Sequence, residues 1–417
     1  MVDPGSSSAS IFNMLQDHIL EIPRVPALPT EVWERVIDFI PAVDRMGGFR
    51  DSRQDLFACA LTCRAWLPRS RLHLFYRVEI PTSRHLSSFA KQIRLYPFLE
   101  EFVREVALWP FEKQSKAVGT FPLMLARKLK SVRILHINMH TTDDYVFPPT
   151  HDVFHISLCE FTSVTTLELN YVKFSTYTAM GRLLSSLPHL SVLACNALYV
   201  SKDIYSKTIE LRKPRRSLSC LAMQFMEMSG NMVECLLADM STASLATIII
   251  MDARQEDINH IDRLLQASGK SLQHFQLNQY RDLWVTSVLP AEKKPILADN
   301  SGLKSICLEL ADGASWISAI LIQLKSAALK SIILEVSPFL TESHLDTYGC
   351  DDIDAIISSE PLSKKLVQLI FQYRFETKQD KEVWMKSEIP RRFPRSATRS
   401  IIRFQRTHRD QAWWETG

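Results

Sequence analysis

The sequence predicts an α/β protein in which a small helical region precedes a solenoid of parallel strands with helices on its outer side. Three observations support this prediction. A six-residue apolar template recurs along most of the chain, segments with helical periodicity lie between its copies, and two amphipathic helices are predicted before the first copy. Because a strand followed by a returning helix buries its apolar face only against the next such unit, a series of these units stacks into a solenoid.

The first predicted helix begins after Pro29 and ends near Pro41. Thr30 can cap its N-terminus, and proline at position 41 is expected to stop it. Its apolar residues recur at helical spacing: Val32, Trp33, Val36, Ile37 and Ile40. They predict one apolar stripe along the helix.

The second predicted helix begins at Asp55, the expected cap, and runs toward Trp66. Its apolar residues are Leu56, Phe57, Ala60, Leu61 and Ala65. Two short helices cannot bury a core alone, so both apolar stripes need a partner.

The order of residue types across this stretch resembles the F-box. That family has Leu-Pro-x-Glu, an amphipathic helix ending near a proline, then Asp-Leu, a small apolar run and Cys-Arg-x-Trp. The matching residues, in order, are Leu28, Pro29, Glu31, Ile37, Pro41, Asp55, Leu56, Cys63, Arg64 and Trp66. The link AVDRMGGFRDSRQ is longer than is usual in the family, and we interpret it as an inserted polar surface loop.

The resemblance implies that an F-box domain, over residues 25–78, binds the Skp-type adaptor of a cullin-RING ubiquitin ligase through an apolar surface. Residues 1–24 are expected to form a flexible lead. The candidate adaptor-binding residues are Leu28, Pro29, Val32, Trp33, Val36, Ile37, Ile40, Leu56, Leu61, Cys63 and Trp66. An ordinary amphipathic pair in a globular core is the alternative interpretation of the same periodicity.

After this region the template L-x-x-L-x-L, with any aliphatic or similar residue at the marked places, recurs. Its copies begin at Val103, Val132, Val164, Leu190, Leu218, Leu245, Leu272, Leu303, Leu329 and Leu366. One copy matches by chance in about one window in ten, so the spacing carries the information. Successive copies begin 29, 32, 26, 28, 27, 27, 31, 26 and 37 residues apart, and the short intervals fit a leucine-rich repeat of about 20–29 residues.

The chain therefore resembles a leucine-rich-repeat protein, which implies a solenoid over residues 79–390 with its strands on the concave side. The family usually places Asn or Cys three residues after the last leucine of the motif. Here those places hold His140, Val172, Leu198, Met226, Ala253, Tyr280, Ala311, Ser337 and Arg374. Because this asparagine ladder is absent and three intervals exceed 30 residues, we expect an irregular solenoid.

Alternation along each strand assigns a face to its residues. The first, fourth and sixth template positions are expected to point into the core, and the third, fifth and seventh onto the concave face. The candidate substrate-binding residues are His136, Asn138, Glu168, Asn170, Asn196, Gln224, Gln276, Asn278, Glu309 and Glu335. Such a mixture of amides and acids is typical of a protein-binding surface, and a merely solvated strand edge is the alternative.

Residues 391–417 are expected to form a basic C-terminal tail. Between Lys386 and Arg409 the sequence holds eight basic residues and one acid, Glu388. A patch for nucleic acid, an acidic partner or nuclear import is one interpretation. We favour a solvated end cap or disordered tail, because the basic residues follow no recognised fold.

Composition limits the classes of function. The chain has 417 residues, 46% of them hydrophobic, with 49 Lys and Arg against 46 Asp and Glu. This balance does not indicate a nucleic-acid-binding protein. The eight cysteines lie mostly inside apolar runs, as buried thiols in a reducing compartment do. Without a signal-peptide pattern or an apolar run near about 18 residues, we expect a cytoplasmic or nuclear protein with no membrane segment.

The sequence has no motif of a catalytic or cofactor site. It lacks a P-loop, G-x-G-x-x-G, G-x-S-x-G and H-E-x-x-H. His151, His155 and Cys159 fall at helical spacing that would suit zinc, but no fourth ligand has a defined spacing, and packing of a repeat helix is the other interpretation. We therefore expect no enzyme, metal or cofactor.

These features predict a substrate-recognition subunit of an SCF-type (cullin-RING) E3 ubiquitin ligase. Its F-box would bind the adaptor, and its repeats would bind an unidentified target protein. A leucine-rich-repeat scaffold without a ligase is the alternative hypothesis. An enzyme with an unrecognised site is a third.

Overall fold

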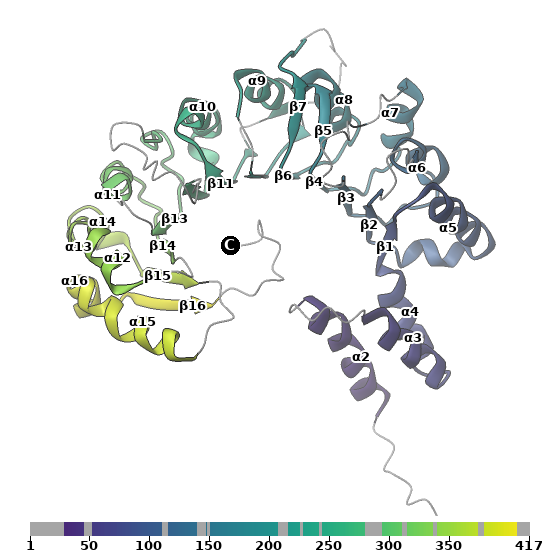
Figure 1. The fold of residues 1–417 in the computed structure, drawn as a ribbon, viewed down its shortest axis with the longest axis horizontal. Helices are drawn as coiled ribbons and strands as arrows, with labels where there is room; N and C mark the ends of the chain where they lie inside the picture. Colours follow the sequence, from purple (N-terminus) through teal and green to yellow (C-terminus); the bar gives the residue numbers. More distant parts are fainter. Residues whose placement is uncertain are drawn as a thin grey trace, which may run out of the picture. The chain divides into compact units, whose positions relative to one another are not determined.

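The computed structural model describes residues 29–45, 52–110, 116–139, 147, 151–206, 216–225, 228–241, 244–279, 294–310, 315–336, 340–373 and 379–406. The chain divides into two compact units. The first comprises Met1–Asp44 with Phe49–Leu74, and the second Arg45–Gly48 with Phe75–Gly417. Figure 1 labels helices and strands of both units.

The first unit is helical. Its described helices are α2 (Thr30–Arg45), α3 (Ser52–Thr62) and α4 (Leu67–Tyr76), the last of which runs on into the second unit. Pro41 does not end α2 as the sequence predicted, since a proline inside a helix removes one backbone donor and the bonds on either side can continue it. The expected polar loop is therefore helical at both ends, and α3 begins before Asp55.

The second unit contains a large parallel sheet. Within the described residues twelve strands lie in the order β1 (Arg77–Ile80), β2 (Glu105–Leu108), β3 (Ile134–Asn138), β4 (Thr166–Asn170), β6 (Val192–Asn196), β9 (Cys220–Gln224), β11 (Thr247–Ala253), β12 (His274–Gln279), β13 (Ser305–Leu310), β14 (Ser331–Val336), β15 (Gln368–Tyr373) and β16 (Ile402–Arg406). Each of β2 to β15 in this order begins two residues after the start of a template copy. The prediction of parallel strands at the template is confirmed.

Helices connect these strands and lie on the outer side of the sheet (Figure 1). They are α5 (Ser83–Leu95), η1 (Pro97–Glu101), α6 (Ala117–Leu125), α7 (Asp152–Leu158), α8 (Tyr177–Ser185), α9 (Gly230–Asp239), η3 (Gln255–Asp257), α10 (Ile258–Ser268), η4 (Gly269–Ser271), α11 (Ser315–Leu321), α12 (Glu342–Thr347), α13 (Cys350–Ser358), α14 (Leu362–Lys365), α15 (Gln379–Arg392) and α16 (Pro394–Thr398). Two short parallel pairs accompany them: β5 (Lys173–Thr176) with β7 (Tyr199–Lys202), and β8 (Arg216–Ser217) with β10 (Met240–Ser241).

The core lies between the sheet and the helices. The first, fourth and sixth template positions supply it, as Val132, Leu135 and Ile137 illustrate, and all three are buried. Alternation therefore assigns the core face as predicted.

The same backbone hydrogen bonds recur between successive strands of the sheet. The carbonyl oxygen of Arg104 accepts from the N–H groups of Arg133 at 2.7 Å and Ile134 at 3.1 Å, and the same pattern recurs along the sheet as far as Lys330. Serine hydroxyls make a second recurring set of hydrogen bonds. Ser271 Oγ donates to Leu245 O at 3.0 Å, and Ser163 and Ser244 donate in the same way to Val132 O and Leu218 O. The repetition of the sequence is thus also a repetition of backbone geometry.

In four successive copies of the template, the residue at the eighth position has a left-handed backbone conformation. These residues are Tyr171, Ala197, Phe225 and Asp252, with φ of 56°, 52°, 49° and 62°. The N–H of Tyr171 donates to Asn196 O at 2.8 Å, and that of Ala197 to Gln224 O at 2.9 Å. The next position in three of these copies is the one where leucine-rich repeats usually have Asn or Cys. Here it holds the buried apolar residues Val172, Leu198 and Ala253. The turn is therefore stabilised by main-chain bonds and apolar packing at these positions.

Residues 391–406 belong to the sheet unit and not to a basic tail, which corrects the prediction for that part of the chain. Strand β16 pairs with β15. Asp354 on α13 accepts from the N–H groups of Arg395 at 2.8 Å and Ser396 at 3.0 Å. Arg399 donates to the carbonyl oxygens of Ile357 and Ser363. Residues 407–417 lie outside the described residues.

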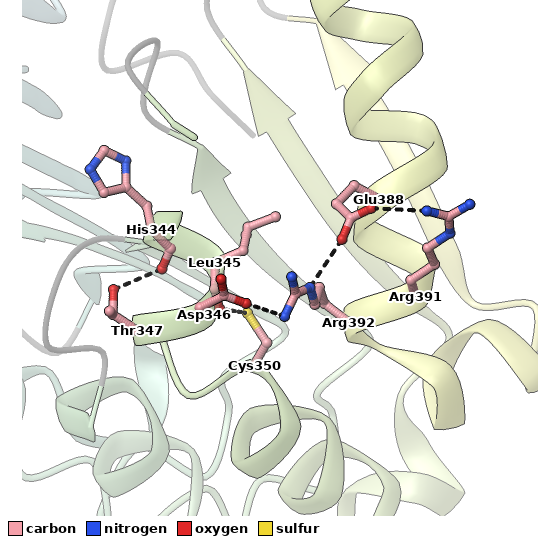
Figure 2. Close-up of polar contacts among 8 residues, drawn as sticks. All are labelled: His344, Leu345, Asp346, Thr347, Cys350, Glu388, Arg391 and Arg392. Atoms are coloured by element: carbon pink, nitrogen blue, oxygen red, sulfur yellow. Dashed lines mark hydrogen bonds and ion pairs between the residues drawn. The ribbon is translucent and has the colours of Figure 1, made fainter. Parts of the chain in front are cut away.

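Figure 2 shows the polar contacts between helices α15 and α12. Arg392 Nε donates to Glu388 Oε1 at 3.1 Å, and the same guanidinium forms an ion pair with Asp346. Arg391 lies beside the other Glu388 oxygen at 3.4 Å. The arginines that looked like a charged patch in the sequence are therefore partly neutralised within the fold.

No helix in the described part of the chain is long and apolar enough to cross a membrane.

Candidate functional site

Helix α2 carries two parallel apolar stripes, and only one of them packs inside the first unit. The inner stripe contains Ile37, of which 1% is exposed, and Trp33. The outer stripe consists of Val32, Val36 and Phe39, which are 39%, 48% and 68% exposed. Since i, i+4 and i+7 lie on one helix face, these three side chains form a continuous apolar strip that the unit itself leaves uncovered.

Helix α3 shows the same division. Leu56 is buried at 2% exposure, whereas Phe57 and Leu61 are 57% and 86% exposed. Phe57 and Leu61 are one helical turn apart, so they too share a face. We call Val32, Val36, Phe39, Phe57 and Leu61 the outer apolar residues of the first unit.

Two contacts hold α2 against the following segment. The ring centroids of Trp33 and Trp66 lie 4.8 Å apart at 42°. Asp38 accepts from Arg69 Nε at 2.5 Å and Nη2 at 2.6 Å, and lies 2.7 Å from His73 Nε2. The hydrogen bond from Arg69 lowers the pKa of Asp38 below its ordinary value, burial opposes this, and His73 adds to the lowering.

The structure divides the predicted adaptor-binding residues into two groups. Pro29, Val32, Val36, Leu61 and Cys63 are exposed. Ile37 and Leu56 are buried, and Trp33, Ile40 and Trp66 are partly buried. We therefore assign Ile37 and Leu56 to packing, because a buried side chain cannot contact a partner in this conformation. Leu28 lies outside the described residues.

Sequence reasoning missed Phe39 and left Phe57 out of the candidate set. The signal for Phe39 was its i+7 spacing from Val32 and its i+3 spacing from Val36. Periodicity alone showed one broad apolar face and not two stripes.

In the second unit the predicted target-binding residues lie on the sheet in register. Asn138, Asn170, Asn196 and Gln224 are successive Cα partners across β3, β4, β6 and β9. His136 pairs with Glu168, and Glu309 with Glu335. The strands therefore bring residues that are 26–32 positions apart in the chain side by side.

His136 lies between two carboxylates. Its Nδ1 is 2.7 Å from Glu168 Oε2, and its Nε2 is 3.7 Å from Glu105 Oε2. Burial opposes protonation, but the two neighbouring carboxylates of Glu105 and Glu168 outweigh it, so the pKa of His136 lies above its ordinary value. Glu105 was not predicted, although it occupies the third position of its template copy.

A second polar cluster joins β12 and β14. Glu335 accepts from Gln276 Nε2 at 3.2 Å and from Asn278 Nδ2 at 2.8 Å. Gln276 and Asn278 are only 4% and 6% exposed, so these two predicted target-binding residues are not accessible in this conformation. Glu309 and Glu335 are partly exposed.

Asp252 fixes the end of the neighbouring strand. Burial raises its pKa to about 6, against the effect of hydrogen bonds from the Gln224 side chain and the Phe225 N–H, and Glu335 adds a further increase. The interaction holds Gln224 and Phe225 in a defined position at the C-terminal end of strand β9.

No group of three or more His, Cys, Asp and Glu residues in the described part of the chain is arranged to hold a metal. His151 and His155 each have a separate local contact: His151 Nδ1 accepts from Val153 N at 3.4 Å, and His155 Nδ1 lies 2.8 Å from Ser186 Oγ. No protein-family model matches the sequence. A comparison with curated proteins found no significant match.

Proposed function

We propose that this protein is a substrate-recognition subunit of an SCF-type E3 ubiquitin ligase. The observation that carries the proposal is the outer stripe of α2, where Val32, Val36 and Phe39 are exposed on a helix whose sequence resembles the F-box. An uncovered apolar strip of this kind fits a helical adaptor surface, since burying apolar area drives most protein association.

In this proposal the first unit binds the Skp-type adaptor through its outer apolar residues. Ile37 and Leu56 support the surface from beneath. The clamp of Asp38 with Arg69 keeps α2 and α4 in a fixed arrangement, so the adaptor meets a surface that needs little ordering, which lowers the cost of binding.

The second unit, in this proposal, is an irregular leucine-rich-repeat solenoid that binds the target protein. The agreement between template copies and strands, and the recurring left-handed turn, support this assignment. The apolar residues at Val172, Leu198 and Ala253 distinguish these repeats from those with an asparagine ladder.

The mechanism is proximity. The first unit docks on the adaptor, the sheet unit holds the target, and separate catalytic subunits of the ligase transfer ubiquitin to a target lysine. Holding two reactants together replaces a bimolecular encounter with an effectively unimolecular one. This chain would contribute no catalytic side chain, and would act in the cytoplasm or nucleus, where the ligase works.

The test is co-purification of the full chain with the Skp-type adaptor and a cullin, beside a chain that lacks residues 25–78. The proposal predicts that both partners are recovered with the full chain and neither with the deletion. Recovery of adaptor without cullin would favour the scaffold hypothesis, and failure to recover adaptor at all would refute the F-box assignment.

A further inference from the structure

Strand β16 is the last strand of the sheet, and one of its two sides is open. Among the described residues it pairs only with β15, and the sheet ends there (Figure 1). The carbonyl oxygen of Ile401 accepts from the N–H of Leu369 on β15 at 2.9 Å. Because alternate residues of a parallel strand bond to the same neighbour, the backbone groups of Ile402 and Phe404 point to the open side. Such an edge is a template for a further strand.

An arginine side chain lies on this open edge. Arg403 Nη1 donates to the carbonyl oxygens of Ile402 at 2.9 Å and Ser400 at 3.1 Å. The Arg403 side chain is exposed, and within the described part of the chain its guanidinium bonds to carbonyl oxygens and to no carboxylate. A guanidinium bonds more strongly to a carboxylate than to a neutral carbonyl. An acidic side chain that arrives at the edge would therefore draw Arg403 away and release both carbonyl oxygens.

The charge around the edge is positive. Residues 391–406 include six arginines and no acid. Arg403 and Arg406 lie on β16 itself and are exposed. Glu382 on α15 interacts with the charge of Arg406, but it is also paired with Lys386. Charge complementarity therefore favours a partner that carries acidic side chains.

The core side of β16 is only partly covered. Ile402 and Phe404 pack against the core and remain partly exposed. Their Cα partners on β15 are Leu369 and Phe371. Both of these residues are 0% exposed, in a strand that has a neighbour on each side. Apolar residues of a further strand would bury the rest of Ile402 and Phe404.

We propose that the open edge of β16 binds an extended acidic segment of the target protein as an added strand. Alternate residues of this segment are apolar, where they cover Ile402 and Phe404, and acidic, where they pair with Arg403 on the other face. A carboxylate of the segment takes the Arg403 guanidinium, and a backbone N–H takes the carbonyl oxygen that Arg403 releases. This inference rests on the proposed target-binding role of the sheet unit and names the class of segment that the unit recognises.

The experiment is a fluorescence anisotropy titration of the full chain with three labelled seven-residue peptides whose ends are blocked. The first, EVEVEVE, alternates acidic and apolar residues. The second, KVKVKVK, reverses the charge. The third, EPEPEPE, keeps the charge, but its prolines remove alternate N–H groups and prevent pairing as a strand. The proposal predicts saturable binding of the Glu-Val peptide, and binding of the other two that is weaker by about tenfold or more.

Charge reversal tests the role of Arg403. Arg403→Glu turns an attraction into a repulsion, so it should weaken binding of the Glu-Val peptide by about tenfold and strengthen binding of the Lys-Val peptide. Arg395→Glu is the matched control, because Arg395 is also exposed and lies on α16, outside the edge strand. It makes the same change in net charge and should leave the order of the three affinities unchanged.

Hydrogen exchange tests the added strand itself. The amides of residues 402–406 should gain protection when the Glu-Val peptide binds, because outward N–H groups of β16 become hydrogen-bonded. The amides of residues 192–196 on β6 should not change, since that strand is paired on both sides.

Three results would overturn the inference. Equal binding of the Glu-Val and Glu-Pro peptides would show that charge alone suffices. Glu-Val binding without protection of residues 402–406 would place the peptide elsewhere. Failure of all three peptides to bind would leave Arg403 as a guard of the edge against self-association. An oligonucleotide of eight thymidines is titrated beside them, and tighter binding of it than of the Glu-Val peptide would assign the arginines to nucleic acid instead.

Adaptor binding measured on the same preparations separates this result from the proposed function. Absence of peptide binding with adaptor binding intact refutes only the edge site. Peptide binding without adaptor binding supports the edge site and refutes the ligase role.

Discussion

The guanidinium of Arg69 on α4 forms a two-pronged ion pair with the carboxylate of Asp38 on α2, at 2.5 and 2.6 Å. The paired geometry fixes both the distance and the relative orientation of the two helices. The adaptor surface proposed for the first unit depends on that arrangement.

Replacing Asp38 should therefore loosen the first unit. Because about a third of each side chain is exposed, solvent screening limits the loss in the free energy of unfolding to about 1 kcal/mol for Asp38→Asn. The folded-state pKa of Asp38 lies below its ordinary value, so this stabilisation is present above the unfolded pKa of about 3.9 and disappears as the pH falls through the folded value. Urea unfolding of both chains at pH 7 and at pH 3 checks this. A difference that grows on acidification would contradict it.

Trp33 belongs to the inner stripe of α2 and stabilises the first unit. Its ring packs on Trp66 with centroids 4.8 Å apart, so Trp33→Ala should lower the stability of the first unit by about 2–3 kcal/mol. Near-UV circular dichroism during urea unfolding measures this loss. An unchanged unfolding transition would show that the Trp33–Trp66 contact contributes little to the stability of the first unit.

Gly302 sits where two repeats approach closely. A Cβ at this position would lie 2.1 Å from the carbonyl oxygen of Lys270, so the backbone must move to accept one. Gly302→Ala should cost about 1–3 kcal/mol in the free energy of unfolding. Gly119→Ala is the control, since a Cβ there meets nothing within 4 Å and Ala is the better helix former in α6. Thermal melts of the two variants should shift in opposite directions, and equal shifts would contradict the close approach.

The strands could be predicted because the template requires only local apolar residues at fixed spacing. Leu135 and Ile137 show the pattern, and their burial follows. Strand β16 was missed although Ile402 and Phe404 alternate with polar residues. The arginines around them suggested a charged tail, whereas pairing with β15 decided the structure.

Some of the proposed adaptor-binding residues could be predicted from the sequence, but not which of them are exposed. Val36 and Ile37 are neighbours on one broad apolar face of α2, yet 48% of Val36 and 1% of Ile37 are exposed. Only the position of the other helices decides which stripe is covered, and helical periodicity carries no information about that. The burial of Gln276 and Asn278 on strand β12 also could not be predicted. Alternation along a strand tells which face a residue lies on, but not whether other parts of the chain cover that face.

Asp252 predicts an unusual pH dependence. Burial first, and Glu335 in addition, raise its pKa to about 6, above the unfolded value of about 3.9. The unfolded chain therefore ionises first, and this group makes the fold less stable as the pH rises from about 4 to 6. The full linkage effect of such a shift is about 3 kcal/mol, and solvent screening of this partly exposed carboxylate reduces it to about 2 kcal/mol or less. Asp252→Asn removes the titration, so its stability relative to the native chain should rise over that range. Urea unfolding at pH 4.5 and pH 7 measures the change, and a relative stability independent of pH would contradict it.

The most direct test of the account is the affinity of the Skp-type adaptor for the full chain, measured by isothermal titration calorimetry. Phe39→Ala and Val36→Ala should each weaken binding by about tenfold or more, or about 1.4 kcal/mol, without lowering the melting temperature. Ile156→Ala on α7 is the matched control, since Ile156 is 65% exposed and Phe39 68%, and should bind as the native chain does. Unchanged affinity in both α2 variants, or no heat of binding from the native chain, would contradict the assignment of the outer stripe of α2 to the adaptor.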